Sequence, residues 1–211
     1  MKKYLDMLPT VVDQIRQIRE IIISNIILIG QVPAPTFHER RRAERLIERM
    51  ADAHLDECSI DDFGNAIGIL RGSSPDAQSI FIVAHLDTFS ETQTEHHYEV
   101  TDKIISGIGV SDNSAAVGVL ASLPEIFRRL NLSFASDIVL AAPCLSLGPG
   151  NLKGIRQLLK SWPGPIRGAV CLESVELGRL NYSSDGMIRG EISCSIATEN
   201  NKDKHYHPNA I

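Results

Sequence analysis

The sequence lacks an excess of basic residues, and this excludes several classes of partner. Lys and Arg total 21 and Asp and Glu total 26, so the formal net charge of the 211 residues is -5. A mildly acidic chain has no general electrostatic attraction for nucleic acid phosphates or for anionic lipid headgroups. We therefore expect neither a nucleic acid nor a membrane as partner.

Long apolar runs and closely spaced cysteines are also missing. The longest apolar stretch, residues 21–29, is interrupted by Ser24 and Asn25 and is far shorter than the roughly 20 residues that cross a bilayer. No continuous apolar core follows Lys2 and Lys3, so we expect no signal peptide and a cytoplasmic location. The four cysteines include no C-x-x-C pair, which favours reduced thiols over disulfides or a thiolate zinc site.

The composition that remains is that of a globular domain. Hydrophobic residues make up 43% of the chain and charged residues 22%. At this length a chain buries roughly 70% of the surface that it exposes when unfolded. One substantial core is therefore expected, with room for a small appendage.

Strand and helix patterns alternate along the chain. Short apolar runs bounded by turn residues predict strands over 65–70, 79–84, 137–142 and 167–172. Apolar residues at three- and four-residue steps predict helices over 10–29, 38–54, 113–130 and 151–159. This alternation is typical of an α/β fold, with a mostly parallel sheet between helices.

Two local patterns near the first helices carry more specific predictions. Thr36 and Glu39 match a capping box at the start of the helix over 38–54. The run Arg40 to Arg42 lies on that helix, and we interpret it as a solvated face without a function.

The strongest candidate for chemistry is the segment from Ala84 to Thr88, directly after an apolar strand. Residues two apart on an extended segment point to the same side, so Asp87 can approach the ring of His85. A carboxylate that accepts from one imidazole nitrogen presents the other nitrogen as a metal ligand. The alternative is a polar strand end with a solvated histidine.

Two carboxylates are expected at the same edge of the sheet. Asp112 ends a glycine-containing loop at the start of a helix, where it is either an N-cap or a metal ligand. It also replaces the third glycine of a dinucleotide fingerprint, which excludes that function. Glu173 follows the last predicted strand. A histidine with two carboxylates is an acceptable zinc site with an open position for water.

The pattern changes beyond Ser183. Residues 187–196 alternate apolar and polar side chains like a half-exposed strand, and residues 199–204 are wholly polar. Residues 208–211 fit the beginning of a helix. We expect a second module here that the chain leaves incomplete.

Several motifs resemble those of the co-catalytic zinc exopeptidase family, which includes peptidase T, carboxypeptidase G and the aminoacylases. Residues 84–88 are similar to its metal-binding A-H-x-D-T motif, residues 107–113 to G-x-G-x-x-D-N, and residues 61–65 to D-x-x-G-N. The resemblance implies a zinc exopeptidase-like catalytic domain over 1–186. It also implies that 187–211 begin an α+β lid and dimerisation domain, so that a homodimer requires a complete lid.

The resemblance also implies roles for the site residues. His85 and Glu173 would bind one zinc ion, Asp112 would bridge two, and Asp87 would orient His85. The family's general-base glutamate and its neighbouring ligand of the second zinc correspond here to Ser146 and Leu147. A serine hydroxyl does not accept a proton at neutral pH, and leucine has no donor atom for a metal.

Two further differences concern the lid and the end of the catalytic domain. Asn200 stands where the family's lid has a histidine, and the family's last histidine ligand falls outside this sequence. The sequence therefore predicts a catalytically impaired metallopeptidase-family protein that holds one zinc ion rather than two, or none. The alternatives are an active aminopeptidase, carboxypeptidase or N-acyl amino acid hydrolase acting on small peptides or N-acyl amino acids, a non-enzymatic binding protein, and a gene fragment.

Overall fold

The computed structural model of the protein describes residues 2–90, 94–173, 180–183 and 186. The chain divides into two units, Met1–Val175 and Glu176–Ile211, and the elements below all belong to the first. The predicted strand over 187–196 and the predicted helix start at 208–211 lie outside the described residues. The boundary at 186 therefore stays a prediction.

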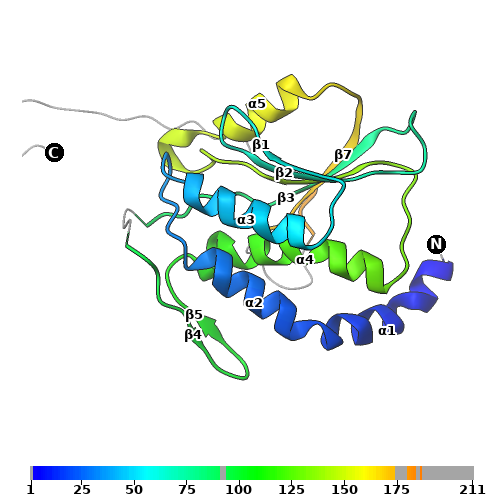
Figure 1. The fold of residues 1–211 in the computed structure, drawn as a ribbon, viewed down its shortest axis with the longest axis horizontal. Coiled ribbons are helices and arrows are strands. Elements are labelled where there is room, and N and C mark those ends of the chain that lie inside the picture. The colour runs from blue at the N-terminus through cyan, green and yellow to red at the C-terminus, as the bar shows by residue number, and fades with distance from the viewer. Residues whose placement is uncertain (1, 91–93, 174–179, 184–185, 187–211) are drawn as a thin grey trace, which may run out of the picture. The chain divides into compact units, whose positions relative to one another are not determined.

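A five-stranded sheet forms the centre of the first unit (Figure 1). Its strands, in spatial order, are β1 (Glu57–Ile60), β2 (Ala66–Leu70), β6 (Ile138–Ala142), β3 (Ser79–Val83) and β7 (Ile166–Cys171). Strand β3 pairs in parallel with β6 and β7, whereas β2 is antiparallel to β1 and β6. All strands except β2 therefore run in one direction, which confirms the predicted α/β fold with a mostly parallel sheet.

Helices cover both faces of this sheet (Figure 1). Helices α3 (Arg40–Asp52) and α4 (Ala115–Arg129) pack on one face and α5 (Lys153–Ser161) on the other, whereas α1 (Lys2–Gln17) and α2 (Arg19–Gly30) pack against α4. Leu46 of α3 and Leu120 of α4 share one buried cluster with Leu140 of β6. On the opposite face, Leu158 of α5 packs with Phe81 and other strand residues. None of the helices in the described ranges is long and apolar enough to cross a bilayer.

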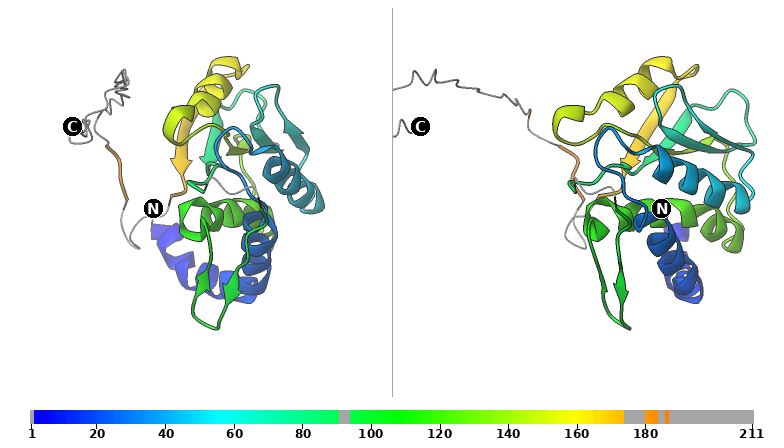
Figure 2. Two further views of the ribbon diagram at one scale, coloured as in Figure 1. Left: turned by 90° about the vertical axis from the view of Figure 1, so that its left-hand side faces the viewer. Right: turned by 60° about the vertical axis from the view of Figure 1, so that its left-hand side comes forward.

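A small hairpin lies outside the main sheet. Its strands, β4 (Glu99–Val100) and β5 (Ile105–Ser106), pair antiparallel and extend away from the sheet beside α2 (Figure 2). Arg19 Nη2 of α2 donates to the carbonyl oxygen of Asp102 in the hairpin, at 2.9 Å. The sequence patterns predicted neither this hairpin nor β1, because such short strands carry too little periodicity.

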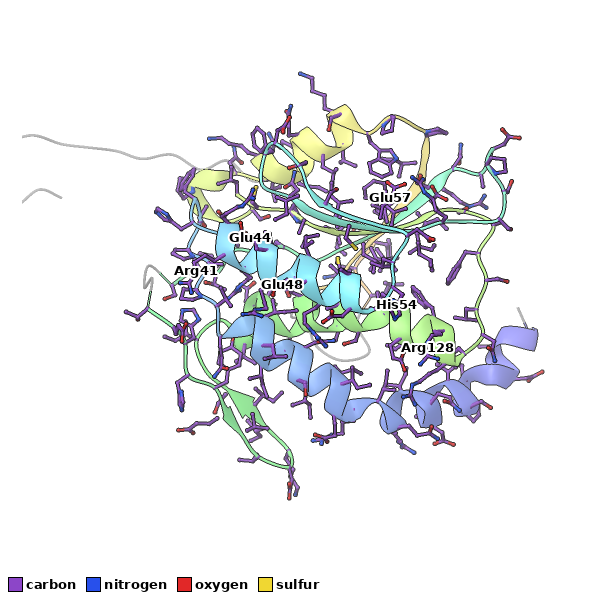
Figure 3. The ribbon with its side chains drawn as sticks, in the orientation of Figure 1. Arg41, Glu44, Glu48, His54, Glu57 and Arg128 are labelled. Atoms are coloured by element: carbon purple, nitrogen blue, oxygen red, sulfur yellow. The ribbon has the colours of Figure 1, made fainter. Side chains whose placement is uncertain are left out.

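Three predictions about the first helices are wrong. The expected continuous helix over 10–29 is two helices, which meet at Ile18 with φ -103° and ψ 12°. The expected capping box is absent: Glu39 precedes α3 without a side-chain cap, and both side chains bond to distant groups described below. The arginine run is exposed at Arg40 and Arg41, but Arg42 is fully buried. Figure 3 shows Arg41 among the outward side chains of this region.

Candidate metal centre

The sheet register brings His85 and Glu173 together. Strands β3 and β7 are parallel neighbours in which Val83 pairs with Cys171, and each of these residues ends its strand. His85 and Glu173 each follow two residues later. Asp112 reaches the same edge from the irregular turn η1 (Val110–Ser114) in front of α4.

The three side chains present their donor atoms to one point. His85 Nε2 lies 3.0 Å from Asp112 Oδ1 and 3.6 Å from Glu173 Oε2, and one ligand atom from each residue lies within 4.8 Å of the others. Tetrahedral zinc with bonds of about 2.0–2.1 Å separates its ligand atoms by roughly 3.3 Å. The donor set and its spacing therefore fit a single divalent ion. Within the described ranges, this is the one cluster of three potential ligands.

The His85 ring is fixed by its second nitrogen. His85 Nδ1 lies 3.0 Å from the carbonyl oxygen of Asp87 and 3.3 Å from Asp87 Oδ1. Burial disfavours the charged imidazolium, but the interactions with the nearby carboxylates of Asp87 and Glu173 outweigh burial and raise the pKa of His85 to about 10. The carboxylates of Asp112 and Glu173 therefore favour a positive charge beside His85 Nε2.

Asp87 connects His85 to Ser146 and Leu147, which follow β6. Its Oδ2 accepts from Thr36 Oγ1 at 2.9 Å and from the backbone N–H groups of Ser146 and Leu147 at 3.0 and 2.7 Å. Burial alone would raise the pKa of Asp87, but hydrogen bonds from His85, Leu147 and Thr36 lower it below its usual range. The carboxylate therefore stays ionised although the residue is fully buried.

Ser146 and Leu147 contribute their backbone rather than their side chains to this network. The Ser146 hydroxyl oxygen is buried and has no hydrogen-bond partner among the described residues.

Asp112 is not an N-cap. Helix α4 begins at Ala115, and its cap residue, Ser114, makes no side-chain cap hydrogen bond. Asp112 itself is extended, with φ -131° and ψ 94°. The neighbouring Asn113 is buried and donates from Nδ2 to the carbonyl oxygen of Leu172 at 3.0 Å. Asn113 thus joins the Asp112 turn to the segment that bears Glu173.

The glycines of the 107–113 loop serve close packing rather than phosphate binding. A Cβ atom on Gly107 would lie 2.4 Å from the ring of Tyr98, and the Tyr98 hydroxyl donates to the carbonyl oxygen of Ile108 at 3.1 Å. Gly109 has a left-handed backbone with φ +68°, which glycine adopts without strain. Tyr98 was not a predicted site residue, because nothing in the local sequence links it to this loop.

Comparison with known proteins shows which fold this is. No family model and no curated protein matches the sequence. Solved structures do match: aminopeptidase PepT from Bacillus cereus has a TM-score of 0.59 at 19% identity, over 72% of this chain and 43% of that one. The di-peptidase Dug1p from Saccharomyces cerevisiae has a TM-score of 0.62 at 13% identity, over 78% and 40%.

The chain has the fold of these peptidases. Aminopeptidase APDkam598 from the archaeon Desulfurococcus kamchatkensis also matches, with a TM-score of 0.56 at 14% identity, over 75% of this chain and 65% of that one. The match spans about two fifths of the length of the first two proteins. The peptidase fold places the candidate ligands at the carboxyl edge of the sheet, where open α/β sheets commonly bind ligands.

Proposed function

We propose that the chain is a member of the zinc exopeptidase family that binds a single zinc ion through His85, Asp112 and Glu173. The convergence of these three donor groups within 4.8 Å is the observation that carries the proposal. The shared peptidase fold supports it, as does the fixed orientation of His85 by Asp87.

Zinc held by three protein ligands lowers the pKa of a bound water and polarises a carbonyl group. In this chain Asp87 keeps the Nδ1 side of the His85 ring engaged, so that Nε2 faces Asp112 and Glu173. The two carboxylates supply negative charge that favours a divalent cation at this point. Peptide hydrolysis also requires a group that takes a proton from water and passes it to the leaving amine.

We propose that this last requirement is not met, and that the chain is catalytically impaired. Ser146 occupies the position of the general base, and Leu147 that of a ligand for a second metal. Loss of a general base typically lowers the rate by a factor of about 10²–10⁴. A zinc-binding protein that recognises small peptides or N-acyl amino acids without efficient turnover is the function that these residues support. Its cytoplasmic location and its oligomeric state stay predictions.

Metal stoichiometry tests the binding part of the proposal. The purified chain, saturated with zinc and passed over a desalting column, is expected to retain one zinc ion per chain by elemental analysis. His85→Ala should abolish retention, whereas His97→Ala, which changes an exposed histidine, should not. Two retained ions, or equal retention by both variants, would contradict a single site at His85.

Turnover tests the impairment. We expect no release of amino acid above blank from di- and tripeptides or from N-acyl amino acids, even at high protein concentration with added zinc. Release that disappears with a chelator and in His85→Ala would overturn the proposed impairment while leaving the metal site intact.

A further inference from the structure

Arg42 is the largest side chain of the described residues that is fully buried, with 0% exposure. Its guanidinium makes four hydrogen bonds. Nε donates to the carbonyl oxygen of Val32 at 2.7 Å and Nη2 to that of Gly30 at 2.9 Å. Nη1 donates to the carbonyl oxygen of Leu86 at 3.1 Å and to Ser114 Oγ at 3.2 Å.

The two acceptors of Nη1 belong to the segments that carry the proposed metal ligands. Leu86 lies between His85 and Asp87, and Ser114 lies two residues after Asp112. A single nitrogen therefore joins the two segments from the side of α3. The proposed ligands themselves do not contact Arg42 through any of these bonds.

We infer that Arg42 is a positioning residue for the metal site, because its guanidinium sets the spacing of His85 and Asp112 by holding Leu86 and Ser114 together. The inference rests on the proposed metal site and extends it to a residue outside the ligand set. It assigns a role to an arginine that the sequence pattern placed on a solvated face.

The chemistry of arginine fits this role. The guanidinium is planar, offers five N–H donors in a rigid fork and keeps its charge. Burial lowers the pKa of Arg42 to about 10, while Tyr98 and Asp87 act in the opposite direction, so the side chain stays protonated at neutral pH. A buried charge is tolerated only when it is hydrogen-bonded, and here its acceptors come from several segments.

The other two acceptors, the carbonyl oxygens of Gly30 and Val32, hold the Arg42 guanidinium in a fixed position. Gly30 is the last residue of α2, and the final carbonyl groups of a helix have no partner within the helix. Arg42 supplies that partner together with a positive charge that favours the negative end of the helix dipole. The Gly30 and Val32 bonds therefore anchor the guanidinium, and its remaining donors are directed at Leu86 and Ser114.

Arg42→Lys tests the inference, because lysine keeps the charge and loses the fork. Arg49→Lys is the matched control: Arg49 lies on the same helix and donates to Asn25 of α2 at 2.9 Å, but no described bond joins it to a ligand-bearing segment. Zinc affinity is measured by competition with a chromophoric chelator, and the fold is checked by circular dichroism. The visible absorption of the cobalt-loaded protein reports coordination geometry.

Arg42→Lys should weaken zinc binding by roughly 10- to 100-fold, the usual effect of removing support from metal ligands, and should alter the cobalt spectrum. Arg49→Lys should leave the zinc affinity and the cobalt spectrum unchanged, even if its melting temperature falls as much as that of Arg42→Lys. Ser114→Ala removes one of the two Nη1 bonds and should weaken zinc binding by a smaller factor, which preserves the test if Arg42→Lys does not fold.

Three outcomes separate this inference from the function on which it rests. Unchanged zinc affinity and cobalt spectrum in folded Arg42→Lys would overturn the role of Arg42 while leaving the metal site intact. If Arg42→Lys does not fold, an unchanged affinity in Ser114→Ala has the same meaning. If the unmodified chain binds no zinc, the proposed function fails and the inference fails with it.

Discussion

At the scale of single residues, two buried charged side chains organise the candidate site. Asp87 binds Thr36, Ser146 and Leu147 through one oxygen and lies beside His85 through the other. Arg42 performs a similar task with the opposite charge, because it donates to the carbonyl oxygen of Leu86 within the 85–87 segment. Because a buried charge requires hydrogen-bond or charge partners, and the partners of Asp87 and Arg42 come from several segments, each of the two side chains holds those segments together.

The His85 cluster predicts a pH-dependent stability for the metal-free chain. The pKa of His85 rises from 6.5 in the unfolded chain to about 10 in the fold. A raised folded-state pKa contributes stability that is fully present below pH 6.5 and is lost as the pH rises toward 10. In the presence of a chelator, the free energy of unfolding should therefore fall over this window by at most about 1.4 kcal/mol per pH unit.

Urea unfolding at a series of pH values measures this loss, with His85→Gln as the comparison. The variant cannot gain a proton at this position, so its decline above pH 6.5 should be shallower. Burial also raises the pKa of Cys144, and the loss of stability from this thiol at higher pH is common to both proteins. Parallel profiles for the two proteins would show that His85 does not carry the effect.

At the scale of elements, the 107–113 loop depends on packing against a residue from another segment. Tyr98 occupies the space that a side chain at Gly107 would need. Tyr98 also packs against Gly30, where an added Cβ would lie 2.5 Å from the Tyr98 hydroxyl oxygen. The tyrosine thus fills the gap between the end of α2 and the loop that leads to Asp112.

Gly107→Ala should therefore destabilise the fold by about 1–3 kcal/mol, the usual cost of forcing extra atoms into a packed region. Gly164→Ala is the control, because an added Cβ there meets nothing within 4 Å. The free energy of unfolding of both variants is measured by chemical denaturation, monitored through the fluorescence of Trp162, which packs edge-on against Phe81. Equal stability of the two variants would show that the Tyr98 contact does not constrain the loop.

At the scale of the whole first unit, the described part of the sheet has two edge strands, β1 and β7, and β7 is the more exposed. Strand β7 is the last strand in the sheet order, and its residues beyond Ile166 are exposed, with Val170 at 52%. An exposed edge strand with apolar side chains offers unpaired N–H and C=O groups to another chain. The unit should therefore tend to self-associate as its concentration rises.

Val170→Lys should reduce this association, since charge on an edge strand opposes pairing, without lowering the melting temperature. Light scattering after size-exclusion chromatography over a concentration series measures it. Ile104→Lys removes an exposed apolar side chain of similar size from the β4–β5 hairpin, where Ile104 is 63% exposed. If the two variants reduce association equally, general apolar exposure rather than the β7 edge is responsible.

The sequence by itself determined the alternation of strands and helices and the position of the candidate ligands along the chain. Strand and helix periods are properties of neighbouring residues, so they can be read locally. Parallel strands end at one edge of a sheet, and so the sequence alone predicts that the residues following β3 and β7 lie close together.

Only the tertiary structure decided which polar side chains bond locally and which bond far away. Thr36 and Glu39 fit a capping box, yet Thr36 donates to Asp87 and Glu39 accepts from the backbone N–H of Leu145, 106 positions along the chain. Arg42 fits a solvated run, yet it is buried against Leu86 and Ser114. The choice depends on burial, because an unsatisfied buried donor or acceptor costs more than a local bond contributes, and burial is fixed only when distant segments pack together.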